Sequence, residues 1–286
     1  MTIVVSGASG FIGAAVTERL CSRSRRVIAI VGKTQRNRSL PSGVENWPAD
    51  EHCSDRLREL GASGPVSLVH CAGLYSLEHS AVQLKSLVDS NMLFGASLVE
   101  ALSSTRGHFV NLSSYFQNQI TPSGAAHSLY AITKHAFSEM VKWFYEFTSI
   151  DVTDLTLYDT YGPNDTRPKL IPSLLAAAKS GRRIDITNRQ VQLSLSYVDD
   201  IVDAIEYVVA SRVTGFWSLR APTQVSIEDV VATIESVTGC KVVDKWINGQ
   251  SRRFIEPHST PVLPGWRPKV SLSQGIKTIW TSDENK

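Results

Sequence analysis

The sequence predicts an α/β fold, a doubly wound parallel sheet with a smaller C-terminal lobe. Short runs of β-branched residues alternate with longer helical segments in the first half of the chain, which is typical of βαβ units. This alternation loosens after Tyr161–Asp165, where short helices and short strands mix. The length of 286 residues suits one such domain with a lobe better than two equal domains. We therefore expect a first domain over 1–160 and a lobe mainly over 161–286, with some segments returning to the first domain.

The expected elements follow from the apolar pattern along the chain. Strands are expected at Ile3–Ser6, Arg26–Val31, Val66–His70, His108–Leu112 and Asp151–Leu157. Helices are expected at Phe11–Cys21, Ala81–Ser103 and Leu129–Phe147, and in the lobe at Leu170–Lys179, Asp199–Ala210, Ser226–Val237 and Ser271–Trp280. Ser226 and Ser271 each begin a capping-box sequence, which marks a helix N-terminus. The polar tail Thr281–Lys286 is expected to fray.

Composition and charge exclude several classes of protein. A formal net charge of +2 is too small for a polyanion-binding surface, so nucleic acid is not an expected partner. The cysteines are scattered without a CxxC pair, and no histidine stands at metal-ligand spacing, so neither a disulfide framework nor a metal site is expected. The chain begins with a strand rather than a signal-peptide pattern, and no apolar run approaches the roughly 18 residues of a membrane span. We expect a cytoplasmic protein without a membrane partner.

A glycine-rich turn, Gly7-Ala8-Ser9-Gly10-Phe11-Ile12-Gly13, follows the first strand and begins the first helix. Glycines at such positions permit a tight turn, close approach of the backbone to a pyrophosphate, and close packing of helix on strand. The helix N-terminus adds unpaired N–H groups and a dipole that favours an anion. The spacing Gly-x-x-Gly-x-x-Gly departs from the common pattern, but its position after a strand predicts a Rossmann-type dinucleotide site. The residues assigned to this site are Gly7, Ser9, Gly10, Phe11, Ile12 and Gly13.

The segment after the second strand indicates which dinucleotide binds. In the Rossmann pattern an Asp or Glu about 20 residues beyond the turn bonds the ribose of NAD, whereas an Arg accommodates the 2′-phosphate of NADP. Here Ile30–Arg38 contains no carboxylate, and positive charge comes from Lys33, Arg36 and Arg38. A solvated basic loop would have the same composition. The missing acid nevertheless favours NADP(H) over NAD(H) as the cofactor.

A tyrosine and a lysine occupy positions i and i+4 of one expected helix, in Tyr130-Ala131-Ile132-Thr133-Lys134, so both lie on one face. The pKa of a free phenol is about 10, and a nearby ammonium favours the phenolate. Tyr130 can then donate a proton to a carbonyl oxygen as hydride arrives, and abstract it in the reverse direction. Ser114 is expected to hold that oxygen, because Ser113 points to the other face of the strand. The predicted catalytic residues are Ser114, Tyr130 and Lys134.

With these motifs the chain resembles the extended short-chain dehydrogenases/reductases, in the group of nucleotide-sugar epimerases, dehydratases and reductases. Further marks of the resemblance are His70-Cys71-Ala72-Gly73, Asn91, Tyr161-Gly162-Pro163, Tyr197-Val198-Asp199-Asp200 and Pro264-Gly265-Trp266-Arg267-Pro268. The resemblance implies that the adenine lies near Asp50, and that the cofactor also contacts Ala72, Gly73, Leu74, Asn91, Tyr130 and Lys134. Relatives pair through the helix that bears the tyrosine, which implies a homodimer.

The chain departs from the family pattern at positions near the substrate. The family usually has Arg and Asn where Thr156 and Asp159 stand, and often an Arg where Leu193 stands. Phosphate contacts are therefore expected from other bases. The residues assigned to the substrate, a nucleotide-diphosphate sugar, are Ser114, Asp159, Arg167, Lys169, Arg189 and Arg253. The segment 157–167 is most similar to the reductases that make dideoxysugars such as abequose and paratose from CDP-linked 4-keto precursors.

The resemblance leaves several reactions to compare. A 4,6-dehydratase would have an Asp-Glu pair after the catalytic hydroxyl, and a GDP-fucose synthase would have a cysteine there, but this chain has Tyr115 and Phe116. We therefore expect NADPH-dependent reduction of the keto group, at C4, of a nucleotide-linked deoxysugar. The nearest alternative is a 4-epimerase with tightly bound NAD. A non-catalytic dinucleotide-binding protein of the same fold is a further alternative, although such members generally lose the tyrosine or the lysine.

Overall fold

The computed structural model of the chain describes residues 1–23, 25–32, 40–105, 107–247, 254–257 and 260–284. The chain forms two compact units. The first unit comprises Met1–Leu157, Val202–Ser218 and Phe254–Leu263, and the second comprises Tyr158–Ile201, Leu219–Arg253 and Pro264–Lys286. The chain therefore returns to the first unit twice after leaving it. Within the described ranges, no helix has both the length and the apolar character needed to cross a bilayer.

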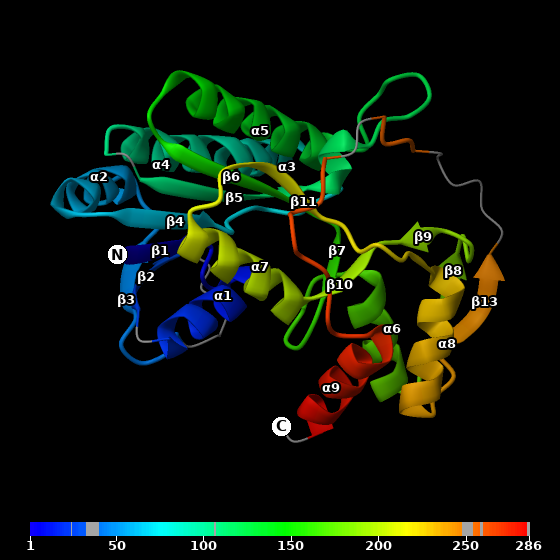
Figure 1. Ribbon diagram of the computed structural model, residues 1–286. Helices are drawn as coiled ribbons and strands as arrows, with labels where there is room; N and C mark the ends of the chain where they lie inside the picture. Colours follow the sequence, from blue (N-terminus) through cyan, green and yellow to red (C-terminus); the bar gives the residue numbers. More distant parts are fainter. Residues whose placement is uncertain (24, 33–39, 106, 248–253, 258–259, 285–286) are drawn as a thin grey trace. The chain divides into compact units, whose positions relative to one another are not determined.

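A seven-stranded sheet forms the centre of the first unit. Its strands are β1 (Thr2–Ser6), β2 (Arg26–Val31), β3 (Glu45–Pro48), β4 (Val66–His70), β5 (His108–Ser114), β6 (Asp151–Leu157) and β11 (Gly215–Leu219). They lie in the order β11-β6-β5-β4-β1-β2-β3, and the pairs from β6 to β3 are parallel (Figure 1). The strand order reverses at β1 and β4, whose carboxyl ends form the switch point where doubly wound sheets bind ligands. The predicted doubly wound α/β sheet is confirmed.

Helices cover both faces of this sheet (Figure 1). They are α1 (Phe11–Ser22), α2 (Cys53–Ser63), α3 (Ala81–Val88), α4 (Phe94–Ser103), α5 (Leu129–Phe147) and most of α7 (Val198–Ser211). On one face α2, α4 and α5 pack against one another, and α1 lies on the other face. Phe109 of β5 and Phe137 of α5 are fully buried, with ring centroids 6.4 Å apart. Burying each such side chain is worth roughly 1.5–3 kcal/mol, which holds α5 on the sheet.

The helix expected at Ala81–Ser103 is interrupted by a π-helical turn. Between α3 and α4, residues Asp89–Leu93 form hydrogen bonds of the wider i to i+5 kind. The helix continues through this turn, so the expected helix over Ala81–Ser103 is confirmed, with a wider turn inside it that was not expected. Asn91 lies in the turn and is 1% exposed. Such turns occur frequently at functional sites.

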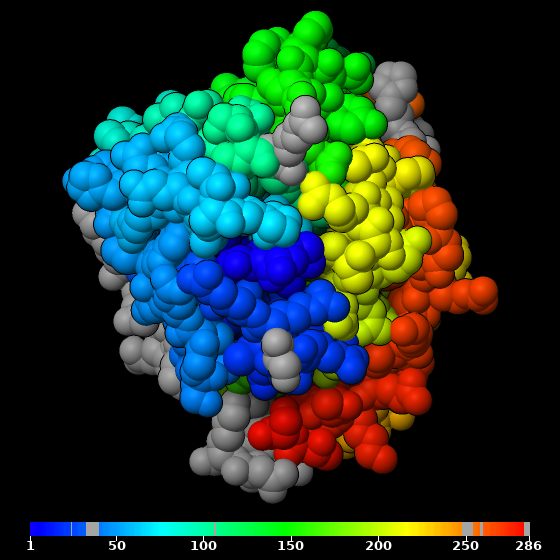
Figure 2. Space-filling model, turned by 60° about the vertical axis from the view of Figure 1, so that its left-hand side comes forward, coloured from blue at the N-terminus to red at the C-terminus, as the bar shows by residue number. Residues whose placement is uncertain are grey.

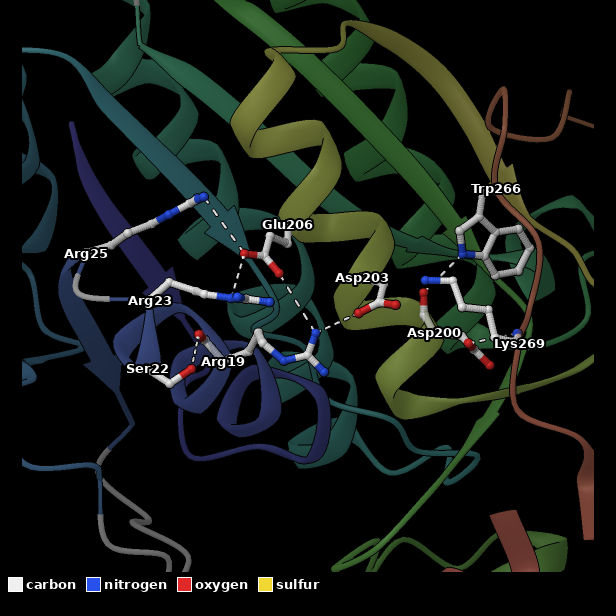
Figure 3. A network of polar contacts seen from close by, with 9 residues as sticks. All are labelled: Arg19, Ser22, Arg23, Arg25, Asp200, Asp203, Glu206, Trp266 and Lys269. Carbon is white, nitrogen blue, oxygen red and sulfur yellow. Dashed lines mark hydrogen bonds and ion pairs between the residues drawn. The ribbon is translucent and has the colours of Figure 1, made fainter. Parts of the chain in front are cut away.

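The first returning segment is joined to α1 by a cluster of charges (Figure 3). Arg19 Nη1 lies 2.6 Å from Asp203 Oδ1 on α7. The Glu206 carboxylate makes ion-pair contacts of 3.5–3.8 Å with Arg19, Arg23 and Arg25. Figure 2 shows the same neighbours at the surface, with the blue α1 beside the yellow residues of α7. A partly exposed ion pair is worth only about 0.2–1 kcal/mol, so the cluster orients α7 more than it stabilises the unit.

The second unit is built from short strand pairs and helices. Its elements are β7 (Asp159–Tyr161), α6 (Leu170–Lys179), β8 (Ile184–Thr187), β9 (Gln192–Leu193), β10 (Leu195–Tyr197), β12 (Val225–Ser226), α8 (Ile227–Thr238), β13 (Val243–Ile247) and α9 (Leu272–Glu284). The strands pair as β10 with β7, β12 with β9 and β13 with β8.

Asp200 anchors the C-terminal segment of the second unit (Figure 3). Its backbone oxygen accepts a hydrogen bond of 3.0 Å from Trp266 Nε1. Its carboxylate accepts hydrogen bonds of 2.9 and 3.3 Å from the amides of Lys269 and Val270. Two motifs that are far apart in the sequence, at 197–200 and 264–268, are thus joined by one side chain and its backbone.

Two expectations about helix ends had different outcomes. The capping boxes are confirmed, since Ser226 Oγ accepts from the amide of Asp229 at 3.0 Å and Ser271 Oγ from that of Gln274 at 3.3 Å. The tail was expected to fray from Thr281, but α9 continues to Glu284, and residues 285–286 lie outside the described residues. Threonine and serine hydroxyls in this last turn bond back to helix carbonyls, as Thr281 Oγ1 does to the Lys277 oxygen at 3.0 Å.

Candidate active site

In the glycine turn after β1, main-chain segments approach each other closely. Gly7 has φ +69°, and a Cβ there would lie 2.6 Å from the Ala72 nitrogen. A Cβ at Gly13 would lie 2.2 Å from the Gly7 oxygen. The amides of Gly7 and Ala8 donate to the Ile30 oxygen at 3.1 and 3.3 Å, which fixes the turn to the end of β2. Both contacts leave room for glycine alone, so the turn lies directly between β1, β4 and α1.

The first turn of α1 has the properties of an anion site. Its N-cap is Gly10, which lacks a side chain to accept from the helix amides, and its first turn contains no acidic residue. The N-terminal amides of a helix point toward an anion placed there and can bind phosphate oxygens, aided by the helix dipole. Phe11 is buried, whereas Ser9 and Ile12 are half-buried. This cradle fits the pyrophosphate of a dinucleotide. The three bases expected to select the cofactor, Lys33, Arg36 and Arg38, lie outside the described residues.

Asn91 fixes the loop that follows β4. Its Oδ1 accepts from the Leu74 amide at 2.7 Å, and its Nδ2 donates to the Leu74 oxygen at 3.0 Å. Nδ2 also donates to Thr133 Oγ1 at 3.1 Å, on the residue before Lys134. Asn91 therefore holds the segment Ala72-Gly73-Leu74 beside α5. Because its amide is occupied in this way, it would act on a cofactor through the position of the loop.

Asp50, expected near the adenine, lies between β3 and α2. Its carboxylate pairs with the guanidinium of Arg56 and accepts from the His52 amide at 3.1 Å. An ionised carboxylate has about four acceptor positions, so these contacts leave capacity for a further donor. The structure thus places Asp50 beyond the end of β2, on the half of the sheet where a Rossmann-type site holds the adenosine part of its cofactor.

Tyr130 and Lys134 lie on the first two turns of α5, whose N-cap Ser128 accepts from the Ala131 amide at 3.2 Å. Lys134 is 4% exposed, and its Nζ donates to the Leu112 oxygen of β5 at 2.8 Å. Burial lowers the pKa of Lys134 to about 8, while the nearby Asp154 raises it in part. The lysine is therefore held against the carboxyl end of β5 as a cation at neutral pH. This is the position from which it can act on Tyr130.

An aromatic cluster surrounds Tyr130. The sequence did not predict that these aromatic residues lie together. The rings of Tyr75 and Phe116 present edges to Tyr130, with centroids 5.1 and 6.4 Å away. The centroid of the His127 ring lies 4.5 Å from that of Phe116 and 4.5 Å from that of Phe254. Burial lowers the pKa of His127, which keeps this imidazole neutral. Rings of this kind pack well on the apolar face of a small substrate.

The two serines at the end of β5 point in different directions, as expected for neighbours in a strand. Ser113 is 3% exposed, and its Oγ bonds to the Asp154 carboxylate and to Thr156 Oγ1, the latter at 3.1 Å. Ser114 is half-buried, and its Oγ accepts from the Phe116 amide at 3.4 Å. Ser114 is thus the serine at the edge that bears the aromatic cluster, while Ser113 belongs to the interior.

Asp154 is a buried carboxylate that sequence analysis missed. It lies in the middle of β6 and is 3% exposed. Burial raises its pKa, and its hydrogen-bond donors and Lys134 lower it. The only signal in the sequence was an aspartate within the otherwise apolar and β-branched run Val152–Leu157, where a solvent-facing residue of an edge strand would look the same.

The residues expected to contact the substrate phosphates fall into two groups within the second unit. Arg167 makes a two-pronged contact with Asp165, at 2.7 and 2.8 Å, and donates to the Thr160 oxygen at 2.9 Å. Asp159 and Lys169 belong to the same group, since burial lowers the pKa of Lys169 and the charges of Asp159 and Asp165 raise it.

Arg189 forms the other group. It is exposed, pairs with Glu228, and lies 5.0 Å above the ring of Trp246. Arg253 lies outside the described residues. The structure therefore brings Asp159, Arg167 and Lys169 together but gives Arg189 partners of its own.

Comparison with known proteins agrees with this geometry. A profile of the NAD dependent epimerase/dehydratase family matches residues 3–216. The chain is 28% identical over 250 residues to a CDP-abequose synthase of Yersinia pseudotuberculosis, which covers 83% of this chain and 84% of that protein. It is 23% identical to a Rhizobium meliloti (strain 1021) protein named "Probable UDP-glucuronate 4-epimerase", with 96% and 95% of the two chains covered.

A solved structure shows that the fold is shared. It is the UDP-glucuronic acid 4-epimerase of Bacillus cereus, in complex with UDP-glucuronic acid and NAD. Its TM-score with this chain is 0.82 at 18% identity, over 100% of this chain and 99% of the other. The family match extends from β1 to β11 and so includes the glycine turn, Ser114 and the Tyr130–Lys134 pair. The chain belongs to the NAD-dependent epimerase/dehydratase family.

Proposed function

We propose that the protein reduces the C4 keto group of a nucleotide-linked deoxysugar with NADPH. The observation that supports this most is the content of the site around Tyr130. Tyr130 with Lys134 supplies a proton donor and Ser114 a hydroxyl, and Tyr115 and Phe116 follow Ser114 where the Asp-Glu pair of a dehydratase would stand. These groups suit transfer of one hydride and one proton and no further step.

The chain's own residues would divide the work in the following way. The cofactor, when bound, supplies hydride to the carbonyl carbon. Ser114 orients the carbonyl oxygen, and Tyr130 gives that oxygen its phenolic proton, so that the keto group becomes an alcohol. Lys134 stabilises the phenolate that remains, because a buried ammonium is a strong electrostatic partner for a neighbouring anion. Solvent then returns a proton to Tyr130.

Two observations support a deoxysugar attached to a nucleotide. The Yersinia relative is named a CDP-abequose synthase, and the segment 157–167 resembles reductases of that kind. We assign the substrate phosphates to bases of the second unit, Arg167, Lys169 and Arg189, with Asp159 as a sugar contact and Arg253 as a further candidate. Remote contacts of this kind supply binding energy that orients the reacting group.

For the cofactor we propose NADP(H) in preference to NAD(H). The segment after β2 has no carboxylate to bond an NAD ribose, and a carboxylate there would repel a 2′-phosphate. The Bacillus cereus structure holds NAD, so NAD(H) is the alternative to be measured against it.

A homodimer is also proposed, with α5 at the interface. Four large apolar side chains of this helix are exposed, namely Ile132 at 50%, Met140 at 37%, Trp143 at 54% and Phe147 at 72%. Apolar residues gathered along one helix in this way are typical of a surface that another protein covers.

The reaction is tested by mass spectrometry with NADPH that carries deuterium at the transferred position. Candidate substrates are nucleotide-linked 4-keto-6-deoxysugars with different nucleotides. We expect one deuterium at C4 of the product sugar and one NADP⁺ for each product formed.

The second candidate function is a 4-epimerase, which the Rhizobium relative's name favours. An epimerase oxidises and then reduces the same sugar, so it consumes no cofactor overall. Interconversion of two nucleotide sugars without net formation of NADP⁺ would therefore replace the proposed reductase with an epimerase.

A further inference from the structure

The proposed chemistry does not use Asp154, a buried carboxylate in the described part of the first unit. Asp154 is in the centre of β6, between the buried residues Thr153 and Leu155. An ionised carboxylate is very costly to bury unless hydrogen bonds and an opposite charge compensate it. The contacts of Asp154 show how it is compensated.

Three donors converge on the Asp154 carboxylate. Asn111 Nδ2 donates to Oδ2 at 2.8 Å, Ser113 Oγ donates to Oδ1, and Ser138 Oγ donates to Oδ2 at 3.3 Å. Asn111 and Ser113 belong to β5, and Ser138 belongs to α5. Asn111 Nδ2 can only donate, and both hydroxyls direct their protons to the carboxylate, so these bonds compensate the ionised form against burial, which raises the pKa of Asp154.

A chain of hydrogen bonds joins Asp154 to the backbone of Ser114. Gln117 Nε2 donates to Ser138 Oγ at 3.1 Å. Ser138 Oγ has two acceptors at 3.3 Å, Asp154 Oδ2 and Gln117 Oε1, and an ionised carboxylate is the stronger acceptor of the two. Gln117 Oε1 in turn accepts from the Ser114 amide, at 3.4 Å. The carboxylate thus fixes the residue that is expected to hold the substrate oxygen.

Lys134 stands one helical turn before Ser138, and its ammonium interacts electrostatically with Asp154. The other titratable groups that interact electrostatically with Lys134 are His70 and Cys71. Burial lowers the pKa of His70 to about 3 and raises that of Cys71 to about 12, so both are neutral at pH 7. Asp154 is therefore the anion of this set.

We propose that Asp154 is a positioning residue, whose buried carboxylate holds Lys134 in its ammonium form and, through Ser138 and Gln117, holds Ser114 in place. This rests on the proposed function, in which the ammonium assists Tyr130. Asp154 itself touches neither substrate nor cofactor. Its effect is exerted on the charge of one neighbour and the position of another.

The test compares Asp154→Asn with Asp151→Asn. Asp151 lies on the same strand, but its carboxylate is 42% exposed and pairs with Arg212. Both substitutions remove one negative charge and keep the size of the side chain. NADPH oxidation is measured against pH with a nucleotide-linked 4-keto-6-deoxysugar.

Loss of the Asp154 charge makes the ammonium of Lys134 less favourable, so its pKa falls below about 8. Activity that needs the ammonium is then lost at a lower pH on the alkaline side. We expect the alkaline midpoint of Asp154→Asn to fall by about 1 pH unit or more. The profile of Asp151→Asn should coincide with that of the unmodified protein. A rate that is reduced equally at every pH, with an unchanged midpoint, overturns the proposal.

A measurement without substrate separates this proposal from the proposed function. The side-chain carbon resonance of Lys134 is titrated by NMR in the full chain labelled with ¹³C-lysine, and is assigned with Lys134→Arg. We expect it to titrate at a lower pH in Asp154→Asn, whether or not any ketosugar is reduced. Asp154→Ser serves as a second variant, since it removes the charge with fewer mismatched donors and is retained if Asp154→Asn fails to fold. An unchanged Lys134 titration in a folded variant overturns the proposal.

Discussion

The glycine turn after β1 is built from backbone atoms, whereas the site around Tyr130 is built almost entirely from side chains. In the turn, the backbone segments approach so closely that no Cβ fits at Gly7 or Gly13. The turn is contiguous in sequence and bonded to β2 and α1 by main-chain atoms. The site around Tyr130 draws on β5, β6 and α5, on the turn that holds Phe116, and on the three loops that hold Tyr75, His127 and Phe254. The comparison teaches that the two regions are sensitive to opposite changes. Adding an atom to the turn should weaken cofactor binding, and removing an atom from the site around Tyr130 should reduce turnover.

The largest effect is expected from removing one oxygen at the side-chain site. Tyr130→Phe keeps the ring among its aromatic neighbours and deletes the proton donor. We expect turnover to fall about 10²–10⁴-fold, with the dissociation constant of NADPH little changed. Steady-state rates and calorimetric titration measure the two quantities. The control is Tyr145→Phe on the same helix, whose ring packs on Phe216 and whose loss of a hydroxyl should leave the rate unaltered. If Tyr130→Phe turned over at close to the rate of the unmodified protein, Tyr130 would not be the proton donor.

A smaller effect is expected from charge at the cofactor site. If Lys33 and Arg36 bind a 2′-phosphate, NADPH binds more tightly than NADH by about 1.5–3 kcal/mol for each charge-assisted hydrogen bond. Replacing both residues with Ala should erase most of that preference, and the binding of NADH should change little. The measurement is the dissociation constant of NADPH and of NADH, for the unmodified protein and for the double variant. If NADPH and NADH had equal dissociation constants in the unmodified protein, the site would not distinguish the two cofactors and the NADP(H) proposal would be wrong.

The backbone site is tested by adding one atom. Gly13→Ala places a Cβ where the Gly7 oxygen lies, 2.2 Å away, so the turn or the start of α1 must move. Overpacking of this kind costs about 1–3 kcal/mol, and we expect weaker cofactor binding together with a lower free energy of unfolding. The control is Gly64→Ala, where a Cβ would meet nothing within 4 Å. Cofactor binding by Gly13→Ala equal to that of the control would show that the turn tolerates a side chain after all.

The smallest effect on the chemistry is expected at the exposed face of α5. Trp143→Glu should convert a homodimer to monomers in sedimentation, because the glutamate would be buried in the interface without a partner. Tyr207→Glu is the control, since Tyr207 of α7 is 47% exposed but lies on another helix. The rate per subunit should change less than in any variant above. A monomeric unmodified protein would exclude the interface.

Sequence alone was sufficient for the parts of the molecule that local chemistry determines. The glycine turn is seven consecutive residues, and Tyr130 and Lys134 are related by the period of a helix, so both motifs were visible. The aromatic cluster was not, because Tyr75, Phe116 and Phe254 come from segments that only the fold brings together. Asp154 was missed for another reason. Its role depends on burial and on neighbours in β5 and α5, and a strand sequence does not say which of its polar residues faces inward.

The π-helical turn at Asp89–Leu93 has a consequence for how the chain tolerates change. It adds one residue to a helix whose two halves, α3 and α4, both pack on the first unit. The wider turn accommodates this extra residue, so deleting a residue here would give a regular α-helical turn and leave α3 and α4 in the same register. The side chains within the turn would change direction, and Asn91 would lose its hydrogen bonds with Leu74. A deletion in this segment should therefore release the loop at Ala72–Leu74, while the buried Leu98 and Leu102 of α4 keep their places in the core.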